Sequence, residues 1–241
     1  MLSGRAPRLP ASLERPNHSS HGAALRRSSR RLKSSRCAAK QPLQVETSHG
    51  LIRVAPLELN DLNAASVVLI RSFATSPDSV TVNLRDVGEF LRSYLAADND
   101  CTFFTAKLTL TDTAALQLGR KDLVVGTAAV SVGEDCGDLD AVQFPASAAV
   151  IANMAVDQKY RKQGIAGLLL QACEQHALAM GTEYISLVVH KQNTPARGLY
   201  ESSGFREMPP AKPTGLSGFL RFGSGTEHIV MAKRVSEDFS V

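Results

Sequence analysis

Apolar and polar residues follow regular patterns from about residue 50 onward, and these patterns predict a succession of strands and helices. Apolar residues at helical spacing predict helices over 57–73, 86–97, 164–180 and 195–202. Short apolar runs rich in β-branched residues predict strands over 51–55, 101–110, 123–132, 148–156, 184–190 and 228–234. The second and third of these strands follow each other across a turn, which predicts a hairpin.

The order of these elements indicates the fold class. One strand and two helices come first, three strands follow, and the chain ends in helix, strand, helix and strand. This order combines an antiparallel half with a strand–helix–strand crossover. We therefore expect an α+β fold with a mixed central sheet flanked by helices, in one domain over residues 50–235. No apolar run approaches the roughly 20 residues that cross a bilayer, so we expect no membrane insertion.

The first 45 residues differ in composition from the rest of the chain. They hold ten of the 27 Lys and Arg residues but only one of the 23 acidic residues, which leaves 17 basic and 22 acidic residues for the remainder. An Arg-rich, Ser-rich and acid-poor N-terminus is typical of an organelle transit peptide. We expect a disordered one over 1–45 that directs the protein to the chloroplast stroma, with the mitochondrial matrix as the alternative. A plain disordered linker and a basic arm that contacts RNA or anionic lipid stay open. Because the positive charge belongs to this leader, we expect no nucleic acid among the partners of the domain.

The four cysteines, Cys37, Cys101, Cys136 and Cys173, show neither paired nor metal-type spacing. This pattern favours reduced thiols over a disulfide framework, and we expect no metal.

A basic turn between the predicted strand 148–156 and the helix after it carries the clearest chemical signal. The turn consists of Arg161, Lys162, Gln163, Gly164, Ile165, Ala166 and Gly167. The free backbone N–H groups and partial positive charge of a helix N-terminus bind anions, and glycine lets the backbone approach the ligand closely. The turn therefore suits a pyrophosphate, although it matches neither the Walker loop nor the GxGxxG fingerprint. The alternative is a tight strand-to-helix connection without a ligand.

Two segments resemble the GNAT (Gcn5-related) N-acetyltransferase family. The segment 153–170, NMAVDQKYRKQGIAGLLL, is similar to the family's acetyl-CoA-binding motif, with Arg161, Gly164 and Ala166 at its key positions. The segment 189–205, VHKQNTPARGLYESSGF, resembles the family's strand, Asn-containing turn, short helix and tyrosine. The resemblance covers about residues 50–235 and is closest to plastid-targeted protein N-terminal and lysine acetyltransferases.

The resemblance implies roles for individual residues. The backbone of Met154, Ala155 and Val156 would bind the pantetheine arm of acetyl-CoA, and the turn from Lys162 to Gly167 would bind its pyrophosphate. Asn193 matches the asparagine that contacts the cofactor, with Thr194, Pro195 and Ala196 next to it. Tyr200 matches the tyrosine that gives a proton to the departing CoA thiolate, which is chemically reasonable for a phenol placed near sulfur. Without the other motifs, Tyr200 would be interpreted as a half-buried tyrosine on a helix face.

Capping residues predict how the helix that carries Tyr200 is held. Thr194 is expected as its N-cap, Pro195 as its first residue, and Gly204 just beyond its end.

One position departs from the family pattern. Some protein N-terminal acetyltransferases of this family carry a glutamate as base on the strand before the asparagine, where this chain has Val188. His190 is the nearest titratable side chain and has a suitable ordinary pKa, but a histidine at a strand end is more often a plain surface residue. The general base is therefore left unassigned.

The resemblance implies an enzyme that transfers acetyl from acetyl-CoA to a protein N-terminal α-amine, a lysine ε-amine or both. Two alternatives stay open: a small-molecule N-acetyltransferase of the arylalkylamine or polyamine type, and a non-catalytic acyl-CoA-binding module. Acceptor choice in this fold depends on the first helices and on loops, here around 75–84 and 209–225. The sequence does not determine the oligomeric state; a monomer is favoured.

Overall fold

The computed structural model describes residues 43–73, 83–95, 101–119, 121–132, 148–208 and 228–235. The predicted transit peptide lies outside the described residues except for its last three positions, and so do Cys37, Cys136 and nearly all of the two predicted acceptor segments. No helix in the described ranges is long and apolar enough to span a membrane.

Eight strands form one mixed sheet, in the order β1-β2-β3-β4-β5-β6-β8-β7. The parallel pair β5–β6 is flanked by antiparallel pairs, because the chain crosses over between these two strands through a helix. The strands are β1 (Gln44–Thr47), β2 (Gly50–Pro56), β3 (Cys101–Thr109), β4 (Asp122–Val132), β5 (Ala149–Val156), β6 (Tyr184–His190), β7 (Arg206–Glu207) and β8 (His228–Arg234).

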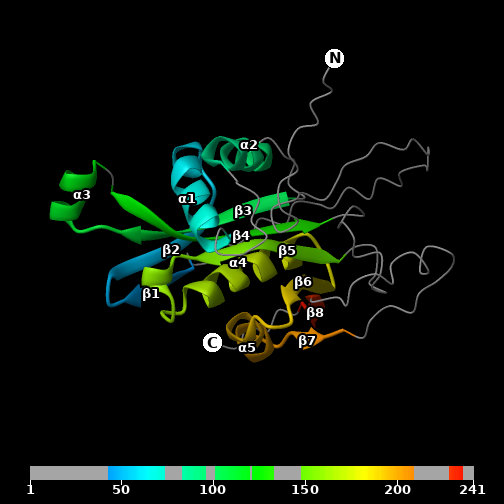
Figure 1. The fold of residues 1–241 in the computed structure, drawn as a ribbon. Helices are drawn as coiled ribbons and strands as arrows, with labels where there is room; N and C mark the ends of the chain where they lie inside the picture. Colours follow the sequence, from blue (N-terminus) through cyan, green and yellow to red (C-terminus); the bar gives the residue numbers. More distant parts are fainter. Residues whose placement is uncertain are drawn as a thin grey trace, which may run out of the picture.

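Helices cover both faces of the sheet. Figure 1 shows α1 and α2 on one face and α4 and α5 on the other, with α3 projecting from the connection between β3 and β4. The helices are α1 (Leu62–Phe73), α2 (Leu84–Leu95), α3 (Asp112–Leu118), α4 (Ile165–Ala179) and α5 (Thr194–Ser202); the 3-10 turns η2 (Leu59–Asp61) and η4 (Gln158–Tyr160) precede α1 and α4. The expected mixed α+β sheet flanked by helices is confirmed.

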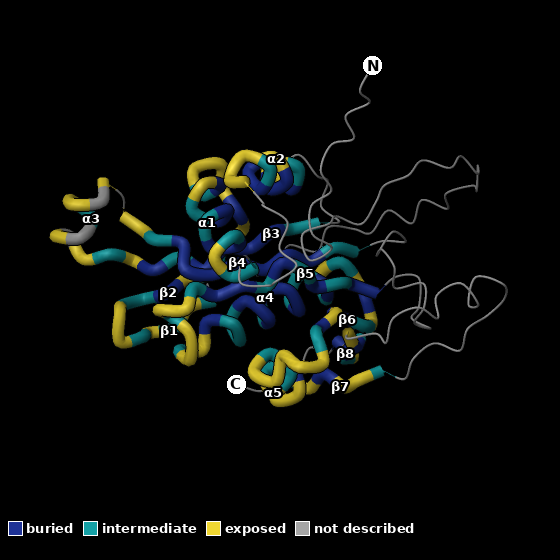
Figure 2. The backbone as a smooth tube through the Cα atoms, in the orientation of Figure 1, coloured by how far each residue is buried: buried dark blue, intermediate teal, exposed yellow. Residues whose placement is uncertain are grey.

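Two hydrophobic clusters, one on each face, hold these layers together. Val125 and Val156 point into the cluster beneath α4 and α5, whereas their neighbours Val124 and Ala155 point into the cluster beneath α1 and α2. This alternation follows from the two-residue period of a strand, and it requires β4 and β5 to be apolar on both sides. The buried strands at the centre of Figure 2 therefore match the continuous apolar runs seen in the sequence.

Three short elements of the structure were not predicted from the sequence patterns. β1 pairs with β2 from Gln44 to Thr47, so the first strand of the domain lies ahead of residue 50, where the sequence suggested that the domain begins. β7 is only two residues long. The connection predicted as a turn between β3 and β4 contains helix α3, whose Leu116 is 85% exposed. These elements bury little, so they produce no clear apolar period.

Candidate active site

β5 and β6 separate after a short paired stretch, and this separation opens the sheet. The two strands pair only at three positions, the last being Ile151 with Leu187. Beyond this point β5 stays on β4 as far as Val156, while β6 stays on β8 as far as His190. The facing edges of β5 and β6 therefore offer backbone N–H and C=O groups that no strand partner uses, and such an edge can hydrogen-bond an extended ligand.

A β-bulge reshapes β5 beside this opening. The register with β4 shifts between Thr127, which pairs with Ala155, and Ala129, which pairs with Ala152. Asn153 lies in this bulge with a φ of 52°, a left-handed conformation that asparagine tolerates better than most residues. The hydroxyl of Thr127 donates to the Asn153 carbonyl oxygen at 3.0 Å and fixes the bulge from the neighbouring strand.

The basic turn predicted from the sequence lies at the start of α4 with unused backbone N–H groups, and we call it the cradle. Gly164 is the N-cap with a φ of 79°, and Lys162 before it also has a positive φ, of 61°. The first hydrogen bond of the helix runs from the Leu168 N–H to the Gly164 carbonyl at 3.1 Å, so the N–H groups at the N-terminus of α4 are not used by the helix itself. A Cβ added at Gly164 or Gly167 would meet no described atom within 4 Å, so the space in front of the cradle is open.

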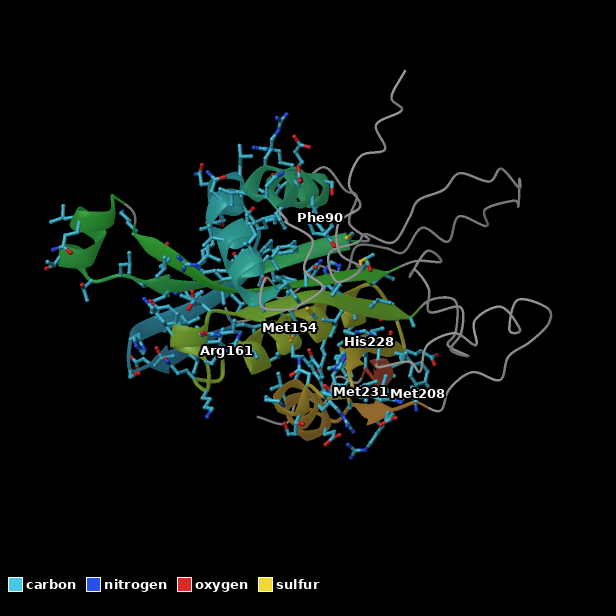
Figure 3. All side chains as sticks on the ribbon, in the orientation of Figure 1. Phe90, Met154, Arg161, Met208, His228 and Met231 are labelled. Carbon is cyan, nitrogen blue, oxygen red and sulfur yellow. The ribbon has the colours of Figure 1, made fainter. Side chains whose placement is uncertain are left out.

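Side chains around the cradle fix its shape. Arg161 turns back, and its Nε donates to the carbonyl of Val156 at 2.9 Å, which ties the turn to the end of β5 (Figure 3). His49, in the turn between β1 and β2, lies 3.2 Å from the Gln163 Oε1 through its Nδ1 and packs edge-on against Tyr160. Sequence reasoning missed His49, because nothing in the local pattern connects it to a turn more than a hundred residues away.

Tyr200 reaches from α5 to β5 at the opening. Its hydroxyl lies 3.7 Å from the Met154 sulfur, and the residue is 8% exposed. Burial, with a smaller contribution from Cys173, raises the pKa of Tyr200 to about 12. The phenol therefore keeps its proton at neutral pH, as a proton donor must.

The start of α5 differs by one residue from the sequence prediction. Asn193 is the N-cap, and its side chain accepts a hydrogen bond from the Ala196 N–H at 3.3 Å. Thr194 is the first helical residue and Pro195 the second, so the predicted Thr194 cap is wrong. Asn193 takes the cap because its amide oxygen reaches the third N–H of the helix. Gly204 follows the helix end with a φ of 89°, as predicted.

The strand β6 brings no acidic side chain to the opening. Val188, at the position where some relatives carry glutamate, is 50% exposed. The Nδ1 of His190 accepts a hydrogen bond from the Gln192 N–H at 3.2 Å, and its ring packs edge-on against His228. Because that bond engages Nδ1, a neutral His190 ring carries its proton on Nε2 and has no further lone pair to offer. The geometry does not support His190 as the base.

Within the described ranges, no three His, Cys, Asp or Glu side chains gather closely enough to hold a metal ion. Cys101 is half-buried, and Cys173 is a buried free thiol.

The sequence model of the acetyltransferase (GNAT) family matches residues 70–205, which is more than half of the chain. The chain belongs to this family. The matched segment contains β5 and β6, the cradle and α5.

Two curated relatives are similar over shorter segments. The chain is 37% identical over 62 residues to GCN5-related N-acetyltransferase 6, chloroplastic, of Arabidopsis thaliana, which is 26% of this chain and 22% of that protein. It is 38% identical over 65 residues to the uncharacterized N-acetyltransferase YycN of Bacillus subtilis, which is 27% of this chain and 42% of that protein. The matches therefore span less than half of each relative.

Solved structures share the fold at low sequence identity. YncA from Salmonella typhimurium, described with its cofactor acetyl-CoA, has a TM-score of 0.53 at 14% identity and covers 78% of this chain and 96% of its own. An uncharacterized protein from Bacillus halodurans has a TM-score of 0.55 at 15% identity, covering 80% of this chain and 90% of its own. At these identities the likeness shows the fold alone.

Proposed function

We propose that this protein is an acetyl-CoA-dependent N-acetyltransferase whose acceptor is a protein N-terminal α-amine, a lysine ε-amine or both. One relationship carries the proposal: a single stretch of β5 links an anion cradle to a buried phenol. Val156 accepts the hydrogen bond from Arg161 at the cradle, and Met154, two residues earlier, contacts the Tyr200 hydroxyl.

The chemistry of this stretch fits acetyl-CoA. The N–H groups from Lys162 to Gly167 would bind the pyrophosphate, because they point out of a helix N-terminus that no described side chain fills. The free edge of β5 from Met154 to Val156 would hydrogen-bond the pantetheine amides. The first turn of α5 lies beside this edge and consists of Asn193, Thr194, Pro195 and Ala196. The same helix carries Tyr200 near its other end. The acetyl-CoA bound by YncA, which shares the fold, supports this assignment.

Groups around the opening can then be assigned to the individual steps of amine acetylation. The nitrogen of a neutral amine attacks the thioester carbonyl carbon, the new C–N bond forms, and the C–S bond breaks. The Tyr200 phenol gives its proton to the departing sulfur, and the resulting phenolate takes a proton from solvent. Free N–H groups on the β5 edge would stabilise the negative charge on the carbonyl oxygen. The amine proton passes to solvent, since the described residues present no base at the opening.

Two observations favour a plastid location. One curated relative bears the name of a chloroplastic N-acetyltransferase. The Arg-rich, acid-poor first 45 residues have the composition of a transit peptide.

The test is a substrate survey with the full chain and acetyl-CoA. A mixed peptide library and a panel of arylalkylamines and polyamines are incubated in parallel, and acetylated products are identified by mass spectrometry. We expect acetylated N-termini or lysines, with yields strongly reduced in Tyr200→Phe and unchanged in Tyr184→Phe, a tyrosine at the paired start of β6. Acetylation of the small amines alone would replace the protein acceptor with a small-molecule one. Binding of acetyl-CoA without any product would indicate a binding module.

A further inference from the structure

The side chain of Asn153 is buried at the opening with one end of its amide unused. The residue is 4% exposed, and its Nδ2 lies 3.5 Å from the hydroxyl of Tyr94 on α2. Its Oδ1 has no hydrogen-bond partner among the described residues. Buried amide oxygens in folded proteins are almost always hydrogen-bonded, since an unsatisfied one costs free energy. A donor that is not part of the described chain therefore fits here.

The position of Asn153 indicates what that donor is. Asn153 lies two residues beyond Ile151, the last residue of β5 that pairs with β6, and immediately before Met154. Met154 packs against the cluster on the α4 and α5 face and meets Tyr200, whereas Asn153 reaches Tyr94 on the α1 and α2 face. Asn153 and Tyr200 thus approach the same point of β5 from opposite faces of the sheet.

The pair is held rigidly. The Tyr94 ring packs edge-on against Phe90 at 5.4 Å and against Phe103 at 5.3 Å, which fixes the hydroxyl that orients the amide. Figure 3 shows Phe90 on the α2 side of the sheet and Met154 at the strand beneath it. The Thr127 hydroxyl fixes the Asn153 backbone in its bulge. A polar group held this firmly, with one free end, is suited to orient a ligand.

From this arrangement we infer that Asn153 binds the acceptor amine: Oδ1 accepts an N–H of the incoming primary amine and directs its lone pair toward the thioester, and Tyr94 is a positioning residue that orients the amide. The inference rests on the proposed acetyltransferase function. A neutral amide oxygen suits this task. It binds an N–H of the uncharged amine, whereas a carboxylate would also favour the protonated ammonium, which has no lone pair to attack with.

Because Asn153 has a positive φ, the test must separate its side chain from its backbone conformation. Asn153→Gly keeps the left-handed conformation and deletes the amide, and Asn153→Asp tolerates the conformation and keeps an oxygen. Ser186→Ala is the matched control, because Ser186 is likewise a buried polar residue, on β6, and its hydroxyl donates to the Ala149 carbonyl within the paired part of the sheet.

The full chain and each variant are assayed with a peptide that carries a free N-terminus and one lysine and that the wild type acetylates. Binding of the same peptide to the CoA-loaded protein is measured by calorimetry, and each melting temperature is recorded. We expect Asn153→Gly to raise the peptide KM and Kd about tenfold, the loss of one hydrogen bond, with an unchanged KM for acetyl-CoA. Asn153→Asp keeps an oxygen acceptor, so its peptide Kd should rise by no more than about threefold. Its kcat should fall, because the carboxylate also binds the protonated ammonium, which cannot attack. Ser186→Ala lowers only the melting temperature.

A wild-type peptide KM and Kd in Asn153→Gly would overturn the inference while leaving the acetyltransferase function intact. Equal increases in the KM of both substrates would also overturn it, because they would show a structural role. If the wild type binds acetyl-CoA but acetylates neither peptides nor small amines, the proposed function fails and the inference falls with it.

Discussion

The Tyr200 hydroxyl lies 3.7 Å from the Met154 sulfur, although the two residues are 46 positions apart in the chain. This contact brings the only tyrosine of α5 to the strand edge that would bind the pantetheine arm. It also explains why Tyr200 keeps its proton, since apolar packing around the phenol disfavours the phenolate.

The pKa of Tyr200, raised to about 12, predicts the alkaline behaviour of the enzyme. At pH 10 an ordinary phenol is half ionised, but Tyr200 remains protonated, so kcat should show no alkaline decrease from this group up to that pH. Tyr200→Phe should lower kcat about 100-fold, in the range typical of a lost general acid, with little change in the Kd of acetyl-CoA. The measurement is kcat against pH for both proteins. A wild-type decrease with an apparent pKa near 10, absent from Tyr200→Phe, would contradict the buried phenol.

The same shift contributes to stability with a defined sign. Because the folded pKa lies above the unfolded value of 10.0, the contribution is complete below pH 10 and disappears as the pH rises toward 12. Chemical unfolding at pH 8 and pH 11 should therefore show a larger loss of stability for wild type than for Tyr200→Phe. Equal losses in the two proteins would mean that Tyr200 titrates normally.

Replacing Gly167 by alanine should increase the stability of the protein and decrease its affinity for acetyl-CoA. It lies in the first turn of α4 with open space around its Cα, so Gly167→Ala should stabilise the free protein by about 0.5–1 kcal/mol. The added methyl group would occupy the cradle and raise the Kd of acetyl-CoA. Gly198→Ala in α5, where the space is also open, is the control and should stabilise without affecting acetyl-CoA. Thermal melts and calorimetry check both; tight acetyl-CoA binding by Gly167→Ala would exclude the cradle as its site.

Asn193 has two separable tasks, the cap of α5 and the proposed contact with the cofactor. Asn193→Ala removes the cap and should cost about 1 kcal/mol of stability. Asn193→Asp keeps a capping oxygen and should unfold like wild type, yet bind acetyl-CoA more weakly, because a carboxylate lacks the N–H donors that the amide offers to the cofactor. Urea unfolding and calorimetry distinguish these effects. Unchanged acetyl-CoA affinity in both variants would reduce Asn193 to a capping residue.

The ion pair between α4 and β8 should be important for stability. Lys233 Nζ lies 3.0 Å from both oxygens of Glu174, whose side chain is 7% exposed. Lys233→Met leaves a buried carboxylate without its partner and should cost about 3–5 kcal/mol, whereas Glu174→Gln combined with Lys233→Met should recover much of this loss. Arg85→Met, which breaks an exposed pair with Glu89, should cost less than about 0.5 kcal/mol. If Lys233→Met and Arg85→Met lost the same free energy of unfolding in urea, the buried pair would contribute no more to stability than the exposed one.

Much of the domain could be predicted from local patterns. The helix from Ile165 to Ala179 agrees with the predicted range to within one residue at each end, because it buries one face. The strand from Tyr184 to His190 matches its predicted range, because it lies in a continuous apolar run. The cradle was equally visible, since only glycine adopts the φ of Gly164 without strain. The elements that were missed, β1, α3 and β7, bury too little to leave such a pattern.

The amino-acid sequence by itself determined where most strands and helices form and which turn could bind an anion, because these properties depend on residues within a few positions of one another. The role expected of Tyr200 came from the resemblance of its segment to a known family. Only the tertiary structure decided where β5 and β6 separate, that Asn153 lies in a bulge, and that its amide meets Tyr94, 59 positions away. Strand register and contacts between distant side chains are set by the packing of the whole sheet against its helices, and no local pattern encodes them.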